Sequence, residues 1–346
     1  MAARAFITGL AGLEITAGER AFIREAQPWG LIIFKRNVST PLQVSELTKS
    51  FRDAVGRQAA VLVDQEGGRV QRLGAPHWPV YPPGARYGEL YDREKSLGLA
   101  CARLAGHLIA ADLVVVGLDV DCLPIADVPV KGGDPVIGDR AYGNQPGKVA
   151  AIAGAIAQGL QSGGVLPVLK HLPGHGRARA DSHHKLPVVD TDRANLEATD
   201  FAAFKPLAHL PLGMTAHVVF SAIDPAQPAT TSVTIVQQVI RGFIGFQGLL
   251  MSDDVSMGAL SGTISGRSQA ALRAGCDLVL HCNGDLAEMA AVASAVPELT
   301  GEAAKRADAA LAMRHAGEDF DIEAARKTFA QMIGGGEPPS QRMTGS

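Results

Sequence analysis

The sequence predicts an α/β fold, a single-domain (β/α)8 TIM barrel, from two observations. Short apolar runs bounded by glycine, proline or aspartate recur along the chain, and amphipathic stretches of helical length separate them. Each run is apolar on both faces, as in parallel strands buried between helices. Eight such runs over about 330 residues fit a TIM barrel, which takes ~250 residues or more. A doubly wound open sheet is the alternative, but no GxGxxG motif follows the first run.

The elements are expected at defined places. The strands are Ala5–Gly9, Gly30–Phe34, Ala59–Val63, Leu113–Leu118, Val165–Leu169, Gly213–Val219, Leu249–Met251 and Leu278–His281. Helices are expected at Pro41–Val55, Glu89–Ala111, Lys148–Gln161, Asp192–Leu207, Ser232–Arg241 and Ser265–Arg273, among others. Asp192 and Ser232 suit N-caps, and Pro41 suits a first helical turn after Thr40. We expect residues 1–333 to form one domain and residues 334–346 to be a disordered tail.

Composition excludes several classes of function. The net charge is −3 and aromatic residues make up 5%, so the chain has no electrostatic footprint or stacking platform for nucleic acid. The four cysteines form no CxxC pair, which suits buried thiols in a reducing compartment. The apolar N-terminal run lacks the features of a signal peptide, and no run approaches the ~18–20 residues that span a bilayer. We therefore expect a cytoplasmic monomer that binds neither nucleic acid nor membrane.

Polar residues at strand ends are the first candidates for a site, because the loops after the strands build the active face of a TIM barrel. Five successive expected strands end in ionisable residues, namely Asp64, Asp119 with Asp121, Lys170 with His171, His217, and Asp253 with Asp254. One polar strand end alone would only mark where a strand meets water. Five together predict a site at one mouth of the barrel.

The acidic pair Asp253-Asp254 would lie at the rim of that mouth. We expect one of the two to carry chemistry and the other to be structural, with Asp254 as the candidate cap of the following helix. Asp64 faces the same choice, and Gly67 and Gly68 beside it predict a tight backbone path that suits close approach to a ligand.

Two arginines are candidates for binding ligand hydroxyls or carbonyls, because a guanidinium group fixes the orientation of what it binds. They are Arg72, close after Asp64, and Arg140, in the glycine-flanked loop 138–143. Taken singly, each would more often be a surface residue. The setting of Arg140 between two glycines favours the site.

The segment 170–183 carries three imidazoles and a Pro-Gly-His-Gly turn, a mixture that packing alone rarely requires. Within it, Asp181 lies two residues before His183. A carboxylate so placed can accept one ring N–H, which fixes the tautomer and raises the basicity of the other nitrogen. The dyad could then donate a proton to a leaving group and later take one from water.

Three motifs are highly specific when they occur together in this order: Asp64-Gln65-Glu66-Gly67-Gly68-Arg69-Val70-Gln71-Arg72, then Lys170-His171-Leu172-Pro173-Gly174-His175-Gly176 with Asp181-Ser182-His183, then Ser252-Asp253-Asp254-Val255-Ser256-Met257. Through them the chain resembles family 3 glycoside hydrolases over roughly residues 5 to 320. The resemblance is to the single-domain bacterial β-N-acetylglucosaminidases that act in peptidoglycan recycling.

That resemblance implies removal of a terminal β-linked N-acetylglucosamine with retention, from N-acetylglucosaminyl-1,6-anhydro-N-acetylmuramyl (peptide) fragments. It implies Asp253 as the nucleophile and His183 as the acid/base, oriented by Asp181. The sugar-binding residues that it implies are Asp64, Arg72, Arg140, Lys170 and His171. It implies no metal or organic cofactor, and a saccharide or muropeptide as the only partner.

Three positions depart from the family pattern. Leu172 stands where phenylalanine is common. Residues 255–258 read Val-Ser-Met-Gly where Leu-Ser-Met-Glu is usual, so Gly258 replaces an acidic residue next to the nucleophile loop.

Three alternatives stay open. The dyad replaces one of the two carboxylates that retaining glycosidases usually place ~5–5.5 Å apart. A neutral imidazole repels an incoming anion less than a carboxylate does, so a phosphorylase on the same site is possible. A metal-dependent TIM-barrel hydrolase using His171, His175, His183 and Asp253 is less favoured, because no His-x-His closes the first strand. The third is a sugar-binding barrel without activity.

Overall fold

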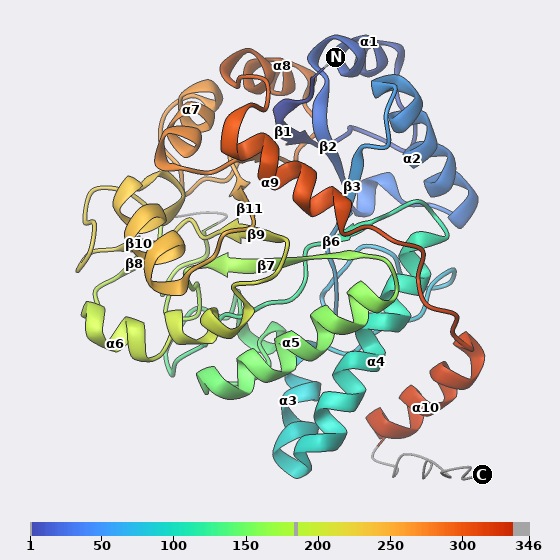
Figure 1. Cartoon of the computed structure of the whole chain (residues 1–346), viewed down its shortest axis with the longest axis vertical. Helices are drawn as coiled ribbons and strands as arrows, with labels where there is room; N and C mark the ends of the chain where they lie inside the picture. Colours follow the sequence, from blue (N-terminus) through green and yellow to red (C-terminus); the bar gives the residue numbers. More distant parts are fainter. Residues whose placement is uncertain (1, 183–185, 335–346) are drawn as a thin grey trace.

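Eight parallel strands close into a barrel in the computed structural model, which describes residues 2–182 and 186–334 (Figure 1). The order around the barrel is β1-β12-β11-β9-β7-β6-β3-β2. The strands are β1 (Arg4–Thr8), β2 (Pro28–Ile33), β3 (Ala60–Val63), β6 (Val120–Asp121), β7 (Leu166–Leu172), β9 (Leu212–Thr215), β11 (Leu249–Asp254) and β12 (Leu278–His281). The predicted TIM barrel is confirmed.

Helices surround the barrel in the described part of the chain (Figure 1). They are α1 (Ala17–Ala26), α2 (Pro41–Val55), α3 (Gly84–Arg93), α4 (Lys95–Val114), α5 (Pro146–Ser162), α6 (Arg193–Ala198), the π-helix η6 (Ile235–Ile244), α7 (Ile264–Ala274), α8 (Leu286–Ala295), α9 (Gly301–Ala312) and α10 (Ile322–Gly334). Helix α2 has the predicted bounds because Thr40 caps it, accepting a hydrogen bond from the Gln43 amide at 3.2 Å, and Pro41 opens its first turn. Asp192 likewise caps α6.

Two predicted helices are each divided. The stretch Glu89–Ala111 belongs to α3 and α4, which meet at the extended residue Glu94. The stretch Asp192–Leu207 holds α6 followed by two short 3₁₀ turns, η3 (Phe201–Ala203) and η4 (Lys205–Leu207). In both cases the apolar periodicity continues across a break in the backbone, so the pattern alone does not mark the boundary.

The fourth predicted strand is wrong. Residues 113–118 form the end of α4 and the turn after it, and the strand at this position is β6, only two residues long. As a result Asp119 precedes its strand instead of following it. Its carboxylate pairs with Arg52 at 3.1 Å and Arg314 at 2.9 Å and accepts from the Val61 amide at 2.7 Å. Asp119 is therefore a structural residue at the N-terminal end of the barrel.

Helix α9 lies across the N-terminal end of the barrel (Figure 1). Arg306 on this helix donates to Asp277 at 2.9 Å, and Asp277 also binds Arg241 at 2.8 Å and the Leu250 amide at 2.9 Å. These contacts anchor α9 to the starts of β11 and β12. With that end covered, the C-terminal ends of the strands form the accessible mouth, as in TIM-barrel enzymes generally.

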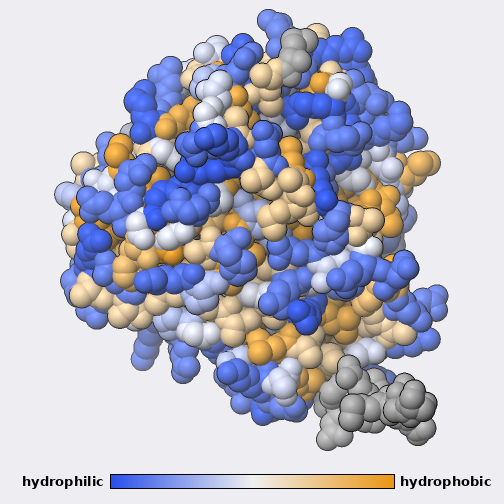
Figure 2. All heavy atoms as spheres, in the orientation of Figure 1, coloured by the Kyte–Doolittle hydropathy of each residue, from blue (hydrophilic) through white to orange (hydrophobic). Residues whose placement is uncertain are grey.

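Helix α4 is long and apolar enough to cross a membrane by length and composition, although the sequence suggested no such run. In the fold, 61% of its apolar window is buried, against α5, α3 and α10. Helix α4 is therefore a buried helix of the layer that surrounds the barrel. Polar and apolar residues are interspersed on the face shown in Figure 2, with exposed large apolar side chains scattered among polar ones.

The four cysteines are buried and unpaired, as the sequence predicts. Gly334, placed in the tail by the sequence, is the last residue of α10. The rest of the predicted tail, residues 335–346, lies outside the described residues.

Candidate active site

A cavity of about 500 Å³ opens at the C-terminal mouth of the barrel. The predicted site residues that line it are Asp64, Arg72, Arg140, Lys170, His171, Asp181 and Asp253. The structure therefore brings together side chains that the sequence scatters over about 190 residues. The remaining one, His183, lies outside the described residues.

A hairpin after β3 places Asp64 and Arg72 side by side. Its strands β4 (Gln65–Gly67) and β5 (Val70–Gln71) pair antiparallel, and Arg72 Nη2 donates to Asp64 Oδ2 at 2.8 Å. Gly67 has φ +91°, and a Cβ there would lie 2.4 Å from the Pro82 carbonyl oxygen. The predicted tight backbone path is thus confirmed, because only glycine fits this turn.

Lys170, at the end of β7, is the centre of a buried network of ion pairs. Its Nζ lies 2.9 Å from Asp64 Oδ1 and 2.7 Å from Glu66 Oε1. Arg140 donates to both oxygens of Glu66, each at 2.8 Å. Fork-to-fork pairing of this kind fixes geometry as well as charge. Glu66 stands in the first sequence motif but was given no role there; its position between two cations is the signal that the structure adds.

The network holds its members charged. Burial alone would raise the pKa of Asp64 and of Glu66, but the adjacent cations outweigh it. Lys170 and Arg72 hold the pKa of Asp64 well below its usual range, and Arg140 and Lys170 lower that of Glu66 to about 2. The same carboxylates raise the pKa of Lys170 and of Arg140 against their burial. Charged donors and acceptors in fixed positions are well suited to hydroxyl groups of a sugar.

His171 is oriented by Asp127, a residue that the sequence analysis missed. His171 Nδ1 lies 2.7 Å from Asp127 Oδ2, and Asp127 is completely buried. This leaves His171 Nε2 for the cavity. Asp127 follows β6 by six residues within an apolar stretch, so neither a motif nor a strand end marked it.

Asp121, on β6, lies beneath this network. It is fully buried, its Oδ1 accepts from the Gln65 amide at 2.9 Å, and its Oδ2 has no partner among the described residues. Burial raises its pKa to about 8, against the Gln65 hydrogen bond and the Lys170 charge. Burial therefore favours the protonated form of Asp121, and Asp121 is not among the described residues that line the cavity.

The two aspartates at the end of β11 make different contacts. The sequence suggested that Asp254 caps the following helix, and this is wrong: Thr263 caps α7, accepting a hydrogen bond from the Gly266 amide at 3.1 Å. Asp254 is structural: its carboxylate accepts from the Ser256 amide at 3.0 Å, the Ser256 hydroxyl at 2.6 Å and the Cys282 amide at 3.2 Å. Asp253 Oδ1 accepts from the Asp254 amide at 2.8 Å. Its Oδ2 accepts no hydrogen bond from the described residues, which leaves it available in the cavity.

Asp253 is kept ionised by its neighbours. Burial would raise its pKa, but the nearby imidazoles of His217 and His171, with the Asp254 amide and Lys170, lower it below the ordinary value. An ionised carboxylate with an unengaged oxygen is the form a nucleophile requires.

A chain of hydroxyl groups supports the backbone of this pair. The Asp253 amide donates to Thr215 Oγ1 at 3.3 Å, and that oxygen lies 2.8 Å from Thr230 Oγ1. Thr230 in turn lies 2.7 Å from His217 Nδ1, and His217 Nε2 donates to the Asp254 carbonyl at 2.9 Å. His217, a candidate from its strand end, therefore bonds the backbone of the strand that carries Asp253.

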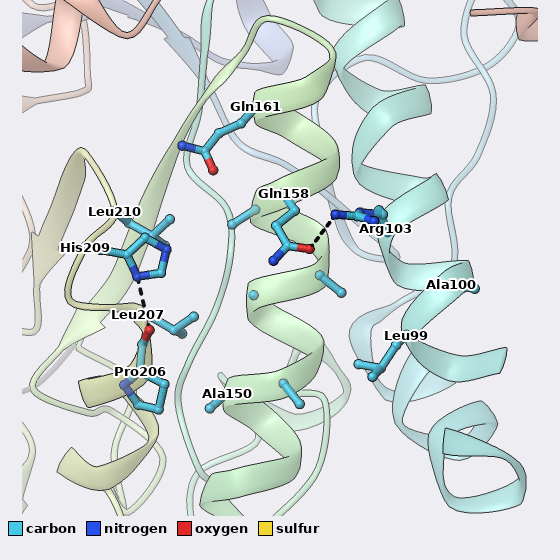
Figure 3. Close-up of a pocket in the computed structure, with 14 residues that line it drawn as sticks. Leu99, Ala100, Arg103, Ala150, Gln158, Gln161, Pro206, Leu207, His209 and Leu210 are labelled. Atoms are coloured by element: carbon cyan, nitrogen blue, oxygen red, sulfur yellow. Dashed lines mark hydrogen bonds between the residues drawn. The ribbon is translucent and has the colours of Figure 1, made fainter. Parts of the chain in front are cut away.

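A second cavity, of about 400 Å³, lies outside the barrel between α4, α5 and the segment around η4 (Figure 3). Figure 3 shows Arg103 and Gln158 in a hydrogen bond of 2.9 Å, with Leu99 and Leu207 among the apolar side chains of its walls. The described lining of this second cavity includes no carboxylate. Carboxylates of the described residues gather instead around the cavity at the barrel mouth. The described residues also hold no group of three or more His, Cys, Asp or Glu side chains arranged to bind a metal ion.

A TIM barrel with a buried aspartate beside a network of charged donors and acceptors fits one class of protein, the glycoside hydrolases. Comparison with known proteins identifies the family. Residues 7–313 match the model of the glycosyl hydrolase family 3 N terminal domain, and the chain belongs to this family.

Similar proteins agree with that assignment. A beta-hexosaminidase of Chromobacterium violaceum is 36% identical over 325 residues, which are 93% of this chain and 90% of the relative. A beta-hexosaminidase of Nitrosomonas eutropha is 39% identical over 278 residues, 79% of each chain. The solved structure of NagZ from Neisseria gonorrhoeae in complex with N-trifluoroacetyl-D-glucosamine has a TM-score of 0.84 at 28% identity, covering 96% of this chain and 97% of that one.

Proposed function

We propose that this glycoside hydrolase is a retaining exo-β-N-acetylglucosaminidase. The observation that carries the proposal is the position of Asp253, ionised and with Oδ2 unengaged by described residues, in the same cavity as the network around Lys170. Two similarities support the acetamido sugar: the names of the beta-hexosaminidase relatives, and the N-acylated glucosamine bound by the similar gonococcal protein.

In the first step, Asp253 Oδ2 attacks the anomeric carbon as the glycosidic bond breaks, and His183 gives its proton to the leaving oxygen. The sugar becomes covalently bound to Asp253 with inverted configuration. In the second step His183 takes a proton from water, whose oxygen attacks the same carbon and releases Asp253. Two inversions give net retention. Asp181 holds the imidazole in the tautomer that this exchange requires.

The ion-pair network would hold the terminal sugar. The Lys170 ammonium group has three N–H donors. Two of them bind Asp64 and Glu66, which leaves one for a hydroxyl of the sugar. Arg140 donates to Glu66 and to the Val136 carbonyl and keeps two N–H groups. Asp64, Arg72 and His171 complete the lining on this side. Because their positions are fixed before binding, little ordering of side chains opposes the interaction with the sugar.

As the natural substrate we propose N-acetylglucosaminyl-1,6-anhydro-N-acetylmuramyl fragments, with or without peptide, in cytoplasmic cell-wall recycling. The proposal follows from the family motifs, in which Asp181-Ser182-His183 and Asp253 are intact. The enzyme would act as a monomer.

Two experiments test this function. Asp253→Ala should abolish cleavage of an aryl N-acetyl-β-glucosaminide, and a 5-fluoro glycosyl donor should leave a mass adduct on the peptide that contains Asp253. Activity of Asp253→Ala within a few-fold of wild type would exclude Asp253 as nucleophile. Product analysis on a muropeptide and on chitobiose, each with and without phosphate, distinguishes hydrolysis from phosphorolysis: a sugar 1-phosphate would replace the proposed hydrolase with a phosphorylase.

A further inference from the structure

Ser182 lies between the two members of the proposed dyad, Asp181 and His183, and is itself buried, with 3% of its surface exposed. Its hydroxyl Oγ lies 3.1 Å from His175 Nε2. Its carbonyl oxygen accepts a hydrogen bond of 3.2 Å from the Ala259 amide, in the loop that follows Asp253. Ser182 is thus bonded on one side to the loop after β7 and on the other to the loop after β11.

His175 is fixed as firmly as Ser182. Its ring is buried, and its backbone amide donates to Asp127 Oδ1 at 2.6 Å. The other oxygen of Asp127 binds His171, whose ring centre is 5.9 Å from that of His175. A continuous series of contacts therefore runs from the sugar-binding His171 through Asp127 and His175 to Ser182.

The protonation state of His175 suits a fixed partner. Burial and the neighbouring His171 lower the pKa of His175 to about 4, so the ring is neutral near pH 7. Its Nδ1 is buried and has no partner among the described residues, so Ser182 Oγ is the one described side chain that its ring nitrogens bind. His175 lines the cavity together with Ser182, and the one hydrogen bond that its ring makes to the described residues is with Ser182.

We propose that His175 and Ser182 are a positioning pair that sets the orientation of the Asp181–His183 dyad relative to the nucleophile Asp253. This inference rests on the proposed function, because it assumes that the dyad is the acid/base. It gives roles to the histidine of the Pro-Gly-His-Gly turn and to the serine of the Asp-Ser-His motif. Both residues line the cavity, and the role proposed for them is to position the dyad, not to react.

The proposal has a specific kinetic consequence. A general acid works only when its proton lies within hydrogen-bond reach of the leaving oxygen. A misplacement of ~1 Å can reduce the rate ~100-fold. The reduction should appear with leaving groups that need a proton, such as the sugar alkoxide released from chitobiose. A dinitrophenolate leaves without protonation, so its release should be insensitive to the orientation of the dyad.

The test compares kcat/KM for chitobiose with kcat/KM for the dinitrophenyl N-acetyl-β-glucosaminide. Ser182→Ala and His175→Phe should each lower the value for chitobiose by about 10- to 100-fold and that for the dinitrophenyl substrate by less than about 3-fold. Ser182→Thr, which keeps the hydroxyl, should restore most of the chitobiose activity. The double variant Ser182→Ala/His175→Phe should be no slower than the slower single variant, because the two residues act through one contact.

A matched control is Ser221→Ala, whose hydroxyl bonds the Val189 carbonyl at 3.3 Å outside the cavity. It should leave both substrates unaffected. Thermal unfolding and N-acetylglucosamine affinity, measured for every variant, identify any that are misfolded. If a single variant is misfolded, the activities of Ser182→Thr and of the double variant test the positioning role. Equal losses on both substrates in a folded Ser182→Ala protein, or no loss on either, would overturn the positioning role.

His183→Ala, measured in parallel, separates this inference from the function beneath it. If His183→Ala discriminates between the two leaving groups and folded Ser182→Ala does not, only the positioning role is wrong. If His183→Ala itself fails to discriminate, the acid/base assignment is wrong and the inference falls with it.

Discussion

Arg140 and Glu66 form a doubly hydrogen-bonded ion pair, with both N···O distances at 2.8 Å, although 74 positions separate them in the sequence. The pair joins the loop around Arg140 to the hairpin after β3. Glu66 also binds Lys170 on β7, so one buried carboxylate links three segments of the site. The geometry of the cavity therefore depends on this one carboxylate.

Replacement of Glu66 by glutamine should destabilise the fold and weaken sugar binding together. Glu66→Gln leaves Arg140 and Lys170 short of one buried negative charge, and breaking a buried pair in this way costs about 3–5 kcal/mol. Urea unfolding should show this loss, and KM for an aryl N-acetyl-β-glucosaminide should rise. The control is Glu89→Gln, which breaks the exposed pair with Arg86; it should cost less than ~1 kcal/mol. Equal stabilities of the two variants would contradict the role of Glu66.

Substitution of the two aspartates on β11 should have different effects on stability and activity. Asp254→Ala removes an acceptor of three hydrogen bonds and should lower the free energy of unfolding by about 1–3 kcal/mol while part of the activity remains. Asp253→Ala should abolish activity with little change in stability. Burial of the Asp253 charge is itself unfavourable, so its removal offsets the loss of its hydrogen bond. Chemical denaturation and a turnover assay on both variants check this. The reverse pattern would exchange their roles.

The pH dependence of stability should report the titration of the buried residue Asp121. Its pKa is about 8 in the folded protein and ~3.9 in the unfolded chain, so the folded state holds an extra proton between these values. Its contribution to stability is complete below pH ~4, falls as pH rises and levels off above pH ~8. Asp121→Asn cannot titrate, so its stability relative to wild type should increase by more than ~1.4 kcal/mol between pH 5.5 and 8.5. A constant difference across this range would mean that Asp121 is ionised throughout.

Thr215 should affect kcat more than KM. Thr215→Val removes the acceptor of the Asp253 amide and the link to Thr230 without changing the size of the side chain much. A loss of ~1 kcal/mol in positioning the nucleophile corresponds to roughly a 5-fold lower kcat. Thr231→Val, whose hydroxyl bonds Gln227 near the surface, is the control and should match wild type. A rise in KM at unchanged kcat would instead place Thr215 among the sugar contacts.

Much of this architecture was predictable because buried parallel strands consist of short runs of apolar residues. The runs at β1, β2, β3, β7, β11 and β12 mark those strands, and the polar ends of β3, β7 and β11 led to Asp64, Lys170 and Asp253. The rule failed at β6. Its two residues are too few to make a run, and the nearby apolar stretch 113–118 mostly continues the apolar helix α4.

Partnerships between distant residues were beyond the sequence. Asp127 orients His171 and fixes His175, yet its neighbours in the chain are apolar, and its role arises only when β6 and β7 are paired. Periodicity likewise shows that a helix such as α9 has an apolar face but not that it covers the end of the barrel. Glu66 was visible as part of a motif, but its two cationic partners come from other segments.

The charged residues that line the cavity within the described part of the chain balance each other. Five are cationic, Arg36, Arg69, Arg72, Arg140 and Lys170, and five are carboxylates, Asp64, Glu66, Asp181, Asp253 and Asp254, so the formal sum is zero. Such a mouth projects little long-range field, and an uncharged sugar gains nothing from electrostatic steering. Capture of a neutral glycoside should thus proceed at the same rate in dilute and in concentrated salt, since there is almost no attraction for counter-ions to screen.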